Sequence, residues 1–143
     1  MFTKFFNEFQ VGDCWASNGR TVTETDLVMF SALSGDWYPL HTDIEYAKST
    51  PFKQRIAHGM LILSISTGLI EMEKGVVAAF YGIERLRFLK PTFINDTVSV
   101  KLEVVDLKEK ENAGVITAKQ SIFNQHGDVV IEGVLKILVN KNK

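Results

Sequence analysis

The chain has 143 residues, of which 45% are apolar and 23% charged, so we expect one domain over residues 1–143 with a sizeable core. Its net charge is −1 and its basic residues are scattered, which argues against a protein that binds nucleic acid or a membrane surface. The single cysteine, Cys14, excludes an intramolecular disulfide and a cysteine-rich zinc site.

No segment of the sequence has the pattern of a targeting or membrane-spanning segment. The N-terminal residues are interrupted by Lys4, Asn7 and Glu8, so they lack the apolar stretch of a signal peptide. The longest apolar run, residues 60–70, is too short to span a bilayer. We therefore expect a soluble cytoplasmic protein.

The first half of the chain carries helical signals after an extended lead-in that has room for one short strand. The run from Thr23 to Asp26 resembles a capping box, and Gly35 stands at the position of a C-cap, which predicts a helix over 24–34. Asp43 is a candidate cap for a second, short helix that extends to about residue 49.

A third helix is predicted from Gly59 to about Lys74, closed by Gly75. It is apolar on nearly every face until Glu71, which is typical of a helix enclosed by the rest of a fold. After it the hydrophobic period changes from helical to two. Strands are predicted over residues 76–88, 97–107, 115–123 and 129–139. These elements predict an α+β fold in which an antiparallel sheet curls around a buried helix.

The stretch 36–59 holds the best candidates for chemistry. Pro39 lacks a backbone donor and favours an extended Tyr38, so we expect a bend and no helix through this point. A carboxylate (Asp36) and an imidazole (His41) on either side of such a bend can face one pocket. The pair is therefore a candidate acid/base pair, and a merely structural loop is the alternative.

His58 and Gly59 stand at the start of the third helix. The free N–H groups and the dipole of a helix start stabilise developing negative charge, and Gly59 lets a ligand carbonyl approach that backbone. A proton-transfer pair beside such a helix start suits reactions that pass through an enolate, such as hydration of a double bond conjugated to a carbonyl. His58 itself is interpreted as a supporting residue that forms hydrogen bonds around the helix start.

A long signature over these residues resembles the MaoC-like dehydratases, which include (R)-specific enoyl-CoA hydratases. It consists of Asp36-x-x-Pro39-Leu40-His41-x-Asp43, then Ala47, Phe52 and Ile56-Ala57-His58-Gly59-Met60-Leu61. Outside it, Phe9-x-x-Gly12-Asp13, the helix over 21–35 and Arg87-Phe88-x-x-Pro91-Thr92-Phe93-x-x-Asp96-Thr97 also match, so the resemblance covers most of the chain.

The resemblance implies a hot-dog fold, assembled as a homodimer or a larger homo-oligomer, and an acyl-CoA thioester as substrate. Asp36 and His41 would activate a water that adds to C3 of a trans-2-enoyl-CoA, and the product would be the (R)-3-hydroxyacyl-CoA. The Gly59 N–H would bind the thioester oxygen, and Thr67 would stand where the family has a serine that supports the aspartate. No metal or organic cofactor is expected. Tyr38 departs from the asparagine usual in the family, which predicts a changed pocket.

Two other functions fit a similar site: a hot-dog acyl-CoA thioesterase, and a non-catalytic acyl-CoA-binding subunit in which Tyr38 has filled the pocket. Arg55, Arg87 and Lys90 are candidates for contacts with coenzyme A phosphates, and ordinary solvated charges are the alternative. Arg85 is expected on the same strand face as Arg87. A metal site formed by His41, Asp43 and His58 is conceivable, but such a ligand set is generic.

Overall fold

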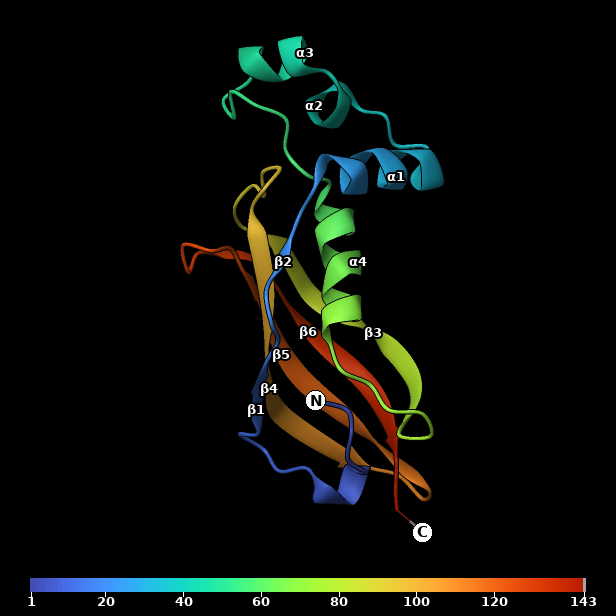
Figure 1. The fold of residues 1–143 in the computed structure, drawn as a ribbon. Coiled ribbons are helices and arrows are strands. Elements are labelled where there is room, and N and C mark those ends of the chain that lie inside the picture. Colours follow the sequence, from blue (N-terminus) through green and yellow to red (C-terminus); the bar gives the residue numbers. More distant parts are fainter. Residues whose placement is uncertain (143) are drawn as a thin grey trace.

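The computed structural model describes residues 1–142 and consists of a long curved sheet with helices on its concave side and at one end (Figure 1). The helical elements are a 3-10 turn at Phe6–Glu8, α1 at Glu24–Ser34, α2 at Pro39–Thr42, α3 at Ile44–Ser49 and α4 at Gly59–Leu69. The strands are β1 at Cys14–Ala16, β2 at Arg20–Thr21, β3 at Val77–Phe88, β4 at Thr97–Glu109, β5 at Ala113–Phe123 and β6 at Val129–Asn140.

The sheet is antiparallel, and its strands follow the order β1-β4-β5-β6-β3, with β2 also paired to β4. This confirms the predicted strands within two residues at each end. Alternation along β4 buries Val98, Val100, Leu102 and Val104, so one face of this strand contributes to the core. The lead-in contains two short strands where one was predicted. β3 lies at an edge of the sheet.

Helix α4 lies against the concave face of the sheet, and a buried polar contact fixes it there. Gln120 on β5 donates from Nε2 to the hydroxyl of Ser66 at 3.0 Å, and both side chains are buried. The Ser66 hydroxyl in turn donates to the Leu63 carbonyl at 2.6 Å. A buried amide that finds a partner in this way restricts how the helix can sit on the strand.

The predicted end of α4 near Lys74 is wrong, because the helix ends at Leu69. Ile70 is already extended, and the N-terminal residue Phe2 pairs with the segment that follows, donating to Glu71 O at 2.8 Å and accepting from Glu73 N at 2.9 Å. The helix is also less enclosed than predicted, since Met60 is exposed. The tertiary pairing of Phe2 therefore overrides the local helical pattern.

Helices α1 to α3 form a separate layer at one end of the sheet (Figure 1). The predicted limits of α1 are confirmed: Thr23 and Asp26 form a capping box, and Gly35 ends the helix at a left-handed φ of 77°. Asp43 caps α3, as predicted, by accepting hydrogen bonds from the N–H groups of Glu45 and Tyr46. Among residues 1–142, none of the helices has the length and apolarity needed to cross a membrane.

Candidate active site

The bend around Pro39 contains one short helical turn, which the sequence did not predict. Tyr38 is extended with ψ of 133°, as expected before proline, but α2 starts at Pro39 itself, where a missing N–H costs nothing. The Asp36 carboxylate accepts a hydrogen bond from the Tyr38 N–H at 3.2 Å. The turn therefore carries His41 back toward Asp36 within six residues.

The tautomer of His41 follows from its hydrogen bond. Its Nδ1 lies 2.7 Å from the main-chain carbonyl of Ile56, which can only accept, so Nδ1 carries the proton. Ile56 is held in turn, because its N–H donates to Leu40 O at 3.3 Å and it forms an isolated bridge with Phe93. In the neutral ring the lone pair therefore lies on Nε2 of His41, and this is the nitrogen that can act as a base.

His58 lies beside this pair and is 2% exposed. Its ring stacks on His41 with centroids 3.9 Å apart and planes at 26°, while Phe30 contacts it at 4.9 Å. Its Nε2 lies 3.1 Å from both the Asp36 carbonyl and the Ser31 hydroxyl. Because the carbonyl can only accept, Nε2 carries the proton, and the buried Nδ1 has no hydrogen-bond partner among the described residues.

Burial is the largest influence on the charge of His58 and lowers its pKa below the ordinary value. The hydrogen bond to the Asp36 carbonyl raises the pKa, the proximity of His41 lowers it, and the Asp36 carboxylate raises it. A second proton on this ring would also place an unpartnered N–H in the interior. His58 is therefore a neutral imidazole at neutral pH.

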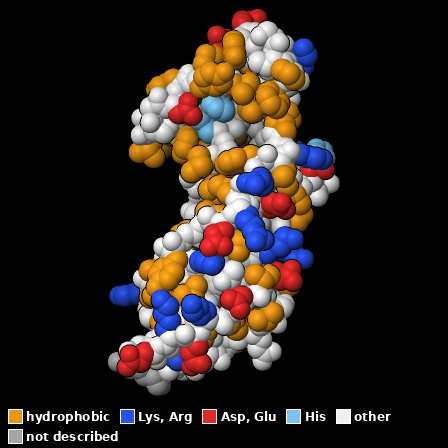
Figure 2. All heavy atoms as spheres, turned by 180° about the vertical axis from the view of Figure 1, so that it is seen from behind, with side chains coloured by type: hydrophobic (Ala, Val, Ile, Leu, Met, Phe, Trp, Pro, Cys, Tyr) orange, Lys and Arg blue, Asp and Glu red, His pale blue; other side chains and the backbone are white. Residues whose placement is uncertain are grey.

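Asp36, His41 and His58 each bring one oxygen or nitrogen to within 4.8 Å of the others. The two imidazoles are stacked, so the lone pairs of their ring nitrogens run side by side and do not converge on one point. A bound transition-metal ion needs ligand lone pairs that converge on it. The group therefore fits proton transfer better than the coordination of one ion. Figure 2 shows histidine atoms at the surface of the helical end, beside an acidic side chain and among hydrophobic ones.

A mostly apolar cavity of about 390 Å³ opens at this point. His41 and Gly59 lie in its wall, and Ile62 and Ile131 add aliphatic surface. The complete lining is His41, Phe52, Ile56, Ala57, Gly59, Met60, Ile62, Phe88, Leu89, Lys90, Pro91, Thr92 and Ile131. A cavity of this size, apolar with few polar groups, is typical of small-molecule sites.

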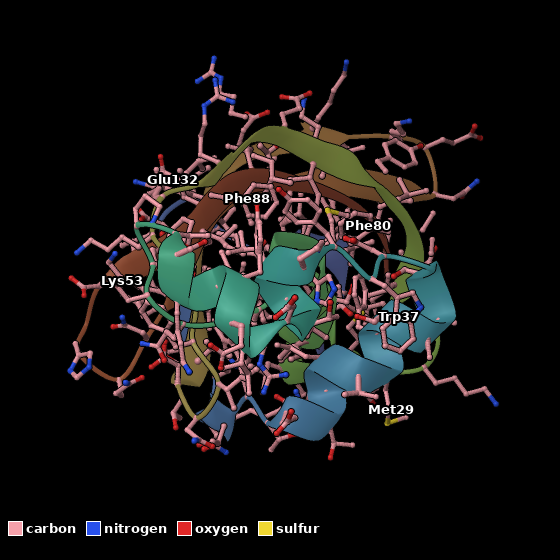
Figure 3. The ribbon with its side chains drawn as sticks, turned by 90° about the horizontal axis from the view of Figure 1, so that it is seen from above. Met29, Trp37, Lys53, Phe80, Phe88 and Glu132 are labelled. Carbon is pink, nitrogen blue, oxygen red and sulfur yellow. The ribbon has the colours of Figure 1, made fainter. Side chains whose placement is uncertain are left out.

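Gly59 is the first residue of α4, so its N–H has no partner within the helix. The structure gives a second reason for glycine here: a Cβ at this position would lie 2.5 Å from the Phe88 ring. Phe88, at the end of β3, points from the sheet inward, toward the middle of the molecule as seen from above (Figure 3). The absence of a side chain at Gly59 therefore lets the aromatic ring close over the helix start.

Tyr38 does not occupy the cavity. Its hydroxyl lies 3.2 Å from that of Tyr46 on α3, and this hydrogen bond raises the pKa of Tyr46. The ring meets His41 edge-on with centroids 6.2 Å apart, and the side chain remains half exposed. Tyr38 thus forms the outer side of the His41 environment and does not fill the pocket, as it would in the alternative of a non-catalytic subunit.

Several predicted residues lie apart from this group. The Thr67 hydroxyl donates to Ser64 O at 2.7 Å within its own helix, and no hydrogen bond joins it to Asp36 among the described residues. Arg55 pairs with Glu24 of α1 at 2.7 Å. Of the predicted basic residues, Lys90 lines the cavity, and it pairs with Asp128 at 2.6 Å.

Arg87 is exposed on β3, and its predicted shared face with Arg85 is wrong. Between Glu84, opposite Val134, and Arg87, opposite Glu132, β3 contains one residue more than β6. Arg85 adopts a left-handed φ of 53° in this bulge. The bulge interrupts the alternation that places residues i and i+2 on one side of a strand.

Two further residues of the site were not identified from the sequence. Ser31 is a buried hydroxyl on α1 that contacts His58 across 27 positions of chain. Phe88 belongs to β3, a strand that the sequence pattern predicted correctly. The contact of its ring with Gly59, however, depends on the curvature of the sheet. The phenylalanine was visible as part of a matching motif, whereas no local signal marked Ser31.

Comparison with known proteins places these features in a family. The MaoC-like domain matches residues 10–125. The chain is 32% identical over 135 residues to the (R)-specific enoyl-CoA hydratase of Rhodospirillum rubrum, covering 94% of this chain and 91% of that protein. It is 42% identical over 103 residues to protein MaoC of Klebsiella aerogenes, covering 71% of this chain but 30% of that longer protein.

A solved structure, a monoamine oxidase regulatory protein from Archaeoglobus, superposes with a TM-score of 0.92 at 40% identity, and 98% of this chain and 96% of that chain are covered. The shared architecture, an antiparallel sheet around a central helix, is the hot-dog fold, as predicted. The family match covers most of the chain and includes the Asp36, His41 and Gly59 positions. The chain therefore belongs to the MaoC-like dehydratase domain family.

Proposed function

We propose that the protein is an acyl-CoA hydro-lyase that reversibly hydrates a trans-2-enoyl-CoA to the (R)-3-hydroxyacyl-CoA, a reaction of fatty acid metabolism in the cytoplasm. The observation that carries this proposal is an Asp36 carboxylate oxygen within 4.8 Å of a ring nitrogen of His41, while His41 and the start of α4 both lie in the wall of an apolar cavity. The membership of hydratases in the family supports the same activity.

In the proposed reaction a water molecule donates one hydrogen bond to the Asp36 carboxylate and one to His41 Nε2. Nε2 takes a proton while the water oxygen forms the bond to C3, and the electron pair of the C2=C3 bond moves toward the thioester oxygen. The N–H of Gly59 binds that oxygen as its charge grows. The proton held on His41 Nε2 is then returned to C2 on the same face, which restores the neutral imidazole and leaves no net proton gained or lost.

The unfilled cavity argues against a non-catalytic subunit closed by Tyr38, since that side chain lies outside the cavity lining. For coenzyme A, we propose Lys90 at the cavity rim as a phosphate contact, with Arg87 as a second exposed cation. Arg55 stays a weaker candidate, because it lies outside the cavity lining and its guanidinium pairs with Glu24. Thr67 remains a predicted support for Asp36, although its hydroxyl binds within α4.

The activity is tested by incubating the pure protein with crotonyl-CoA and with longer and branched trans-2-enoyl-CoAs. Loss of the conjugated enoyl-thioester absorbance, together with a gain of one water by mass spectrometry, is expected for wild type and not for Asp36→Asn. EDTA should leave the rate unchanged, since we propose no metal or organic cofactor. Release of free thiol would indicate a thioesterase, and equal rates for wild type and Asp36→Asn on every substrate would refute the proposal.

We also propose that the chain assembles as a homodimer. β3 lies at the sheet edge, where it exposes Phe80 and Tyr81, and α1 exposes Met29 and Leu33. Figure 3 shows Met29, Trp37 and Phe80 toward the same side of the molecule. Unpaired strand edges and clustered apolar side chains are typical of surfaces that a partner covers. Light scattering coupled to size exclusion should give about twice the 16.1 kDa chain mass, and a monomer would contradict this proposal.

A further inference from the structure

His58 is a buried titratable side chain to which the proposed reaction assigns no step. It is buried and lies outside the cavity lining, so a substrate in the cavity does not reach it. Its ring nevertheless contacts both proposed catalytic residues, His41 through the 3.9 Å stack and Asp36 through the 3.1 Å contact to the main-chain carbonyl. We propose that His58 is a positioning residue that holds Asp36 and His41 together. The His58 ring stays neutral, so that the pair of imidazoles accepts a single proton and this proton lies on His41.

Contacts from two helices fix the position of the His58 ring. Phe30 packs against the His58 ring at 4.9 Å and Ser31 contacts its Nε2, so α1 fixes the orientation of the imidazole. As the residue before α4, His58 is also tied to the start of that helix. A ring held from two helices can restrict the main chain at Asp36 and the plane of His41. Errors of about 1 Å in such placement cost about 100-fold in rate.

The charges around His58 favour a neutral ring. The titratable groups that act on His58 from the elements packed around it are Asp36 in the loop and His41 on α2, while Phe30 and Ser31 on α1 carry no charge. Two stacked imidazolium rings would repel each other strongly in a partly buried site. Since His58 is the buried ring, with no partner for a second N–H among the described residues, the proton taken from water resides on His41.

The inference depends on the proposed function for its catalytic meaning, but its central test does not need substrate. The chain has three histidines, so ¹⁵N-labelled side chains give a simple spectrum that His41→Ala and His126→Gln assign. Between about pH 8 and 5.5 we expect the His58 ring to stay neutral as the Nε2–H tautomer, because burial lowers its pKa. Titration of His58 near the ordinary value of about 6.5 would overturn the proposal.

The pH dependence of protein stability is a second test of whether His58 is neutral in the folded chain. Because burial lowers the pKa of His58 in the folded chain, the unfolded chain binds more protons once the pH falls below about 6.5. Wild-type stability, measured by urea unfolding, should therefore decrease more steeply from pH 7 to 5.5 than that of His58→Gln, whose amide does not titrate in this range. Equal slopes in the two proteins would contradict a depressed His58 pKa.

Two variants separate the two contacts in activity assays. His58→Gln retains an amide donor for the Asp36 carbonyl but lacks the ring, whereas His58→Phe retains a ring against His41 but lacks the donor. For each we expect kcat to fall about 10- to 100-fold with KM changed less than about threefold. The same Gln substitution at His126, in the exposed turn after β5, is the matched control and should leave kcat unchanged.

The outcomes distinguish this inference from the proposed function. If wild type hydrates an enoyl-CoA and both folded His58 variants keep wild-type kcat, positioning by His58 is wrong and the function stands. If wild type transforms no enoyl-CoA while the variants still change the His41 resonance and tautomer, the function is wrong and the structural role of His58 stands. A change in melting temperature alone, without change in kcat or in the His41 signal, would indicate a purely structural residue and overturn the proposal.

Discussion

Replacing His41 by alanine is expected to lower kcat for enoyl-CoA hydration by about 10²- to 10⁴-fold, the usual contribution of a general acid/base group. The reason is the tautomer: the Ile56 carbonyl holds the proton on Nδ1 and leaves Nε2 as the base beside the cavity. Alanine removes that base and leaves the Asp36 carboxylate alone to orient the water. The measurement is kcat on whichever enoyl-CoA wild type turns over fastest.

The same variant should fold normally, because His41 is half-buried and makes one side-chain hydrogen bond. Loss of that bond and of part of the stack predicts about 1 kcal/mol of destabilisation. His126→Ala, an exposed histidine, serves as the control with unchanged kcat and stability. Normal turnover by His41→Ala, or its failure to fold while the His126 variant folds, would show that His41 is a structural residue.

The second large effect is expected from Gly59→Ala. The new methyl group would lie 2.5 Å from the Phe88 ring, too close for any real contact, so the ring must move. Phe88 is 52% exposed and lines the cavity, so the ring has room to rotate, and its movement changes the shape of the site. A strain of about 1–3 kcal/mol is typical of such overpacking. We expect kcat/KM to fall about 10- to 100-fold, with 1.4 kcal/mol equivalent to about tenfold.

A double-mutant cycle tests this explanation. Phe88→Leu provides space for the methyl group, so Gly59→Ala should cost much less kcat/KM in the Phe88→Leu background than in wild type. Gly68→Ala in the same helix is the matched control, since a Cβ there meets no described atom within 4 Å. It should raise stability by up to about 1 kcal/mol through helix propensity. Equal losses for Gly59→Ala in both backgrounds would exclude the Phe88 contact as the cause.

Local signals in the sequence were sufficient for much of the fold. The limits of α1 could be predicted because Thr23, Asp26 and Gly35 are neighbours whose side chains and φ angle act directly on the helix ends. The alternation along β4 likewise acts residue by residue. The end of α4 could not be found in this way, since it depends on Phe2, which approaches from nearly 70 positions away in the chain.

In the candidate site too, features with a local signal could be predicted, and contacts between distant segments could not. Asp36, His41 and Gly59 were found through their residue types, their spacing around a proline and a long family signature. The tautomer of His41, the stack with His58 and the contact of Ser31 were not accessible, because each depends on the distance between elements that no local pattern encodes. The bulge at Arg85 was missed for a related reason: a single extra residue leaves the composition of a strand unchanged.

The buried bond between Ser66 and Gln120 has a consequence at the opposite end of its helix. If helix α4 slid along the sheet as a rigid body, both of its ends would move by the same distance. The hydrogen bond of Ser66, near the last turn, therefore also fixes the position of the first N–H of the helix. Sliding would strand the glutamine amide in the interior at a cost of about 1–3 kcal/mol. The position of the Gly59 N–H along the sheet is thus determined by a polar contact two helical turns away, on the concave face of the sheet.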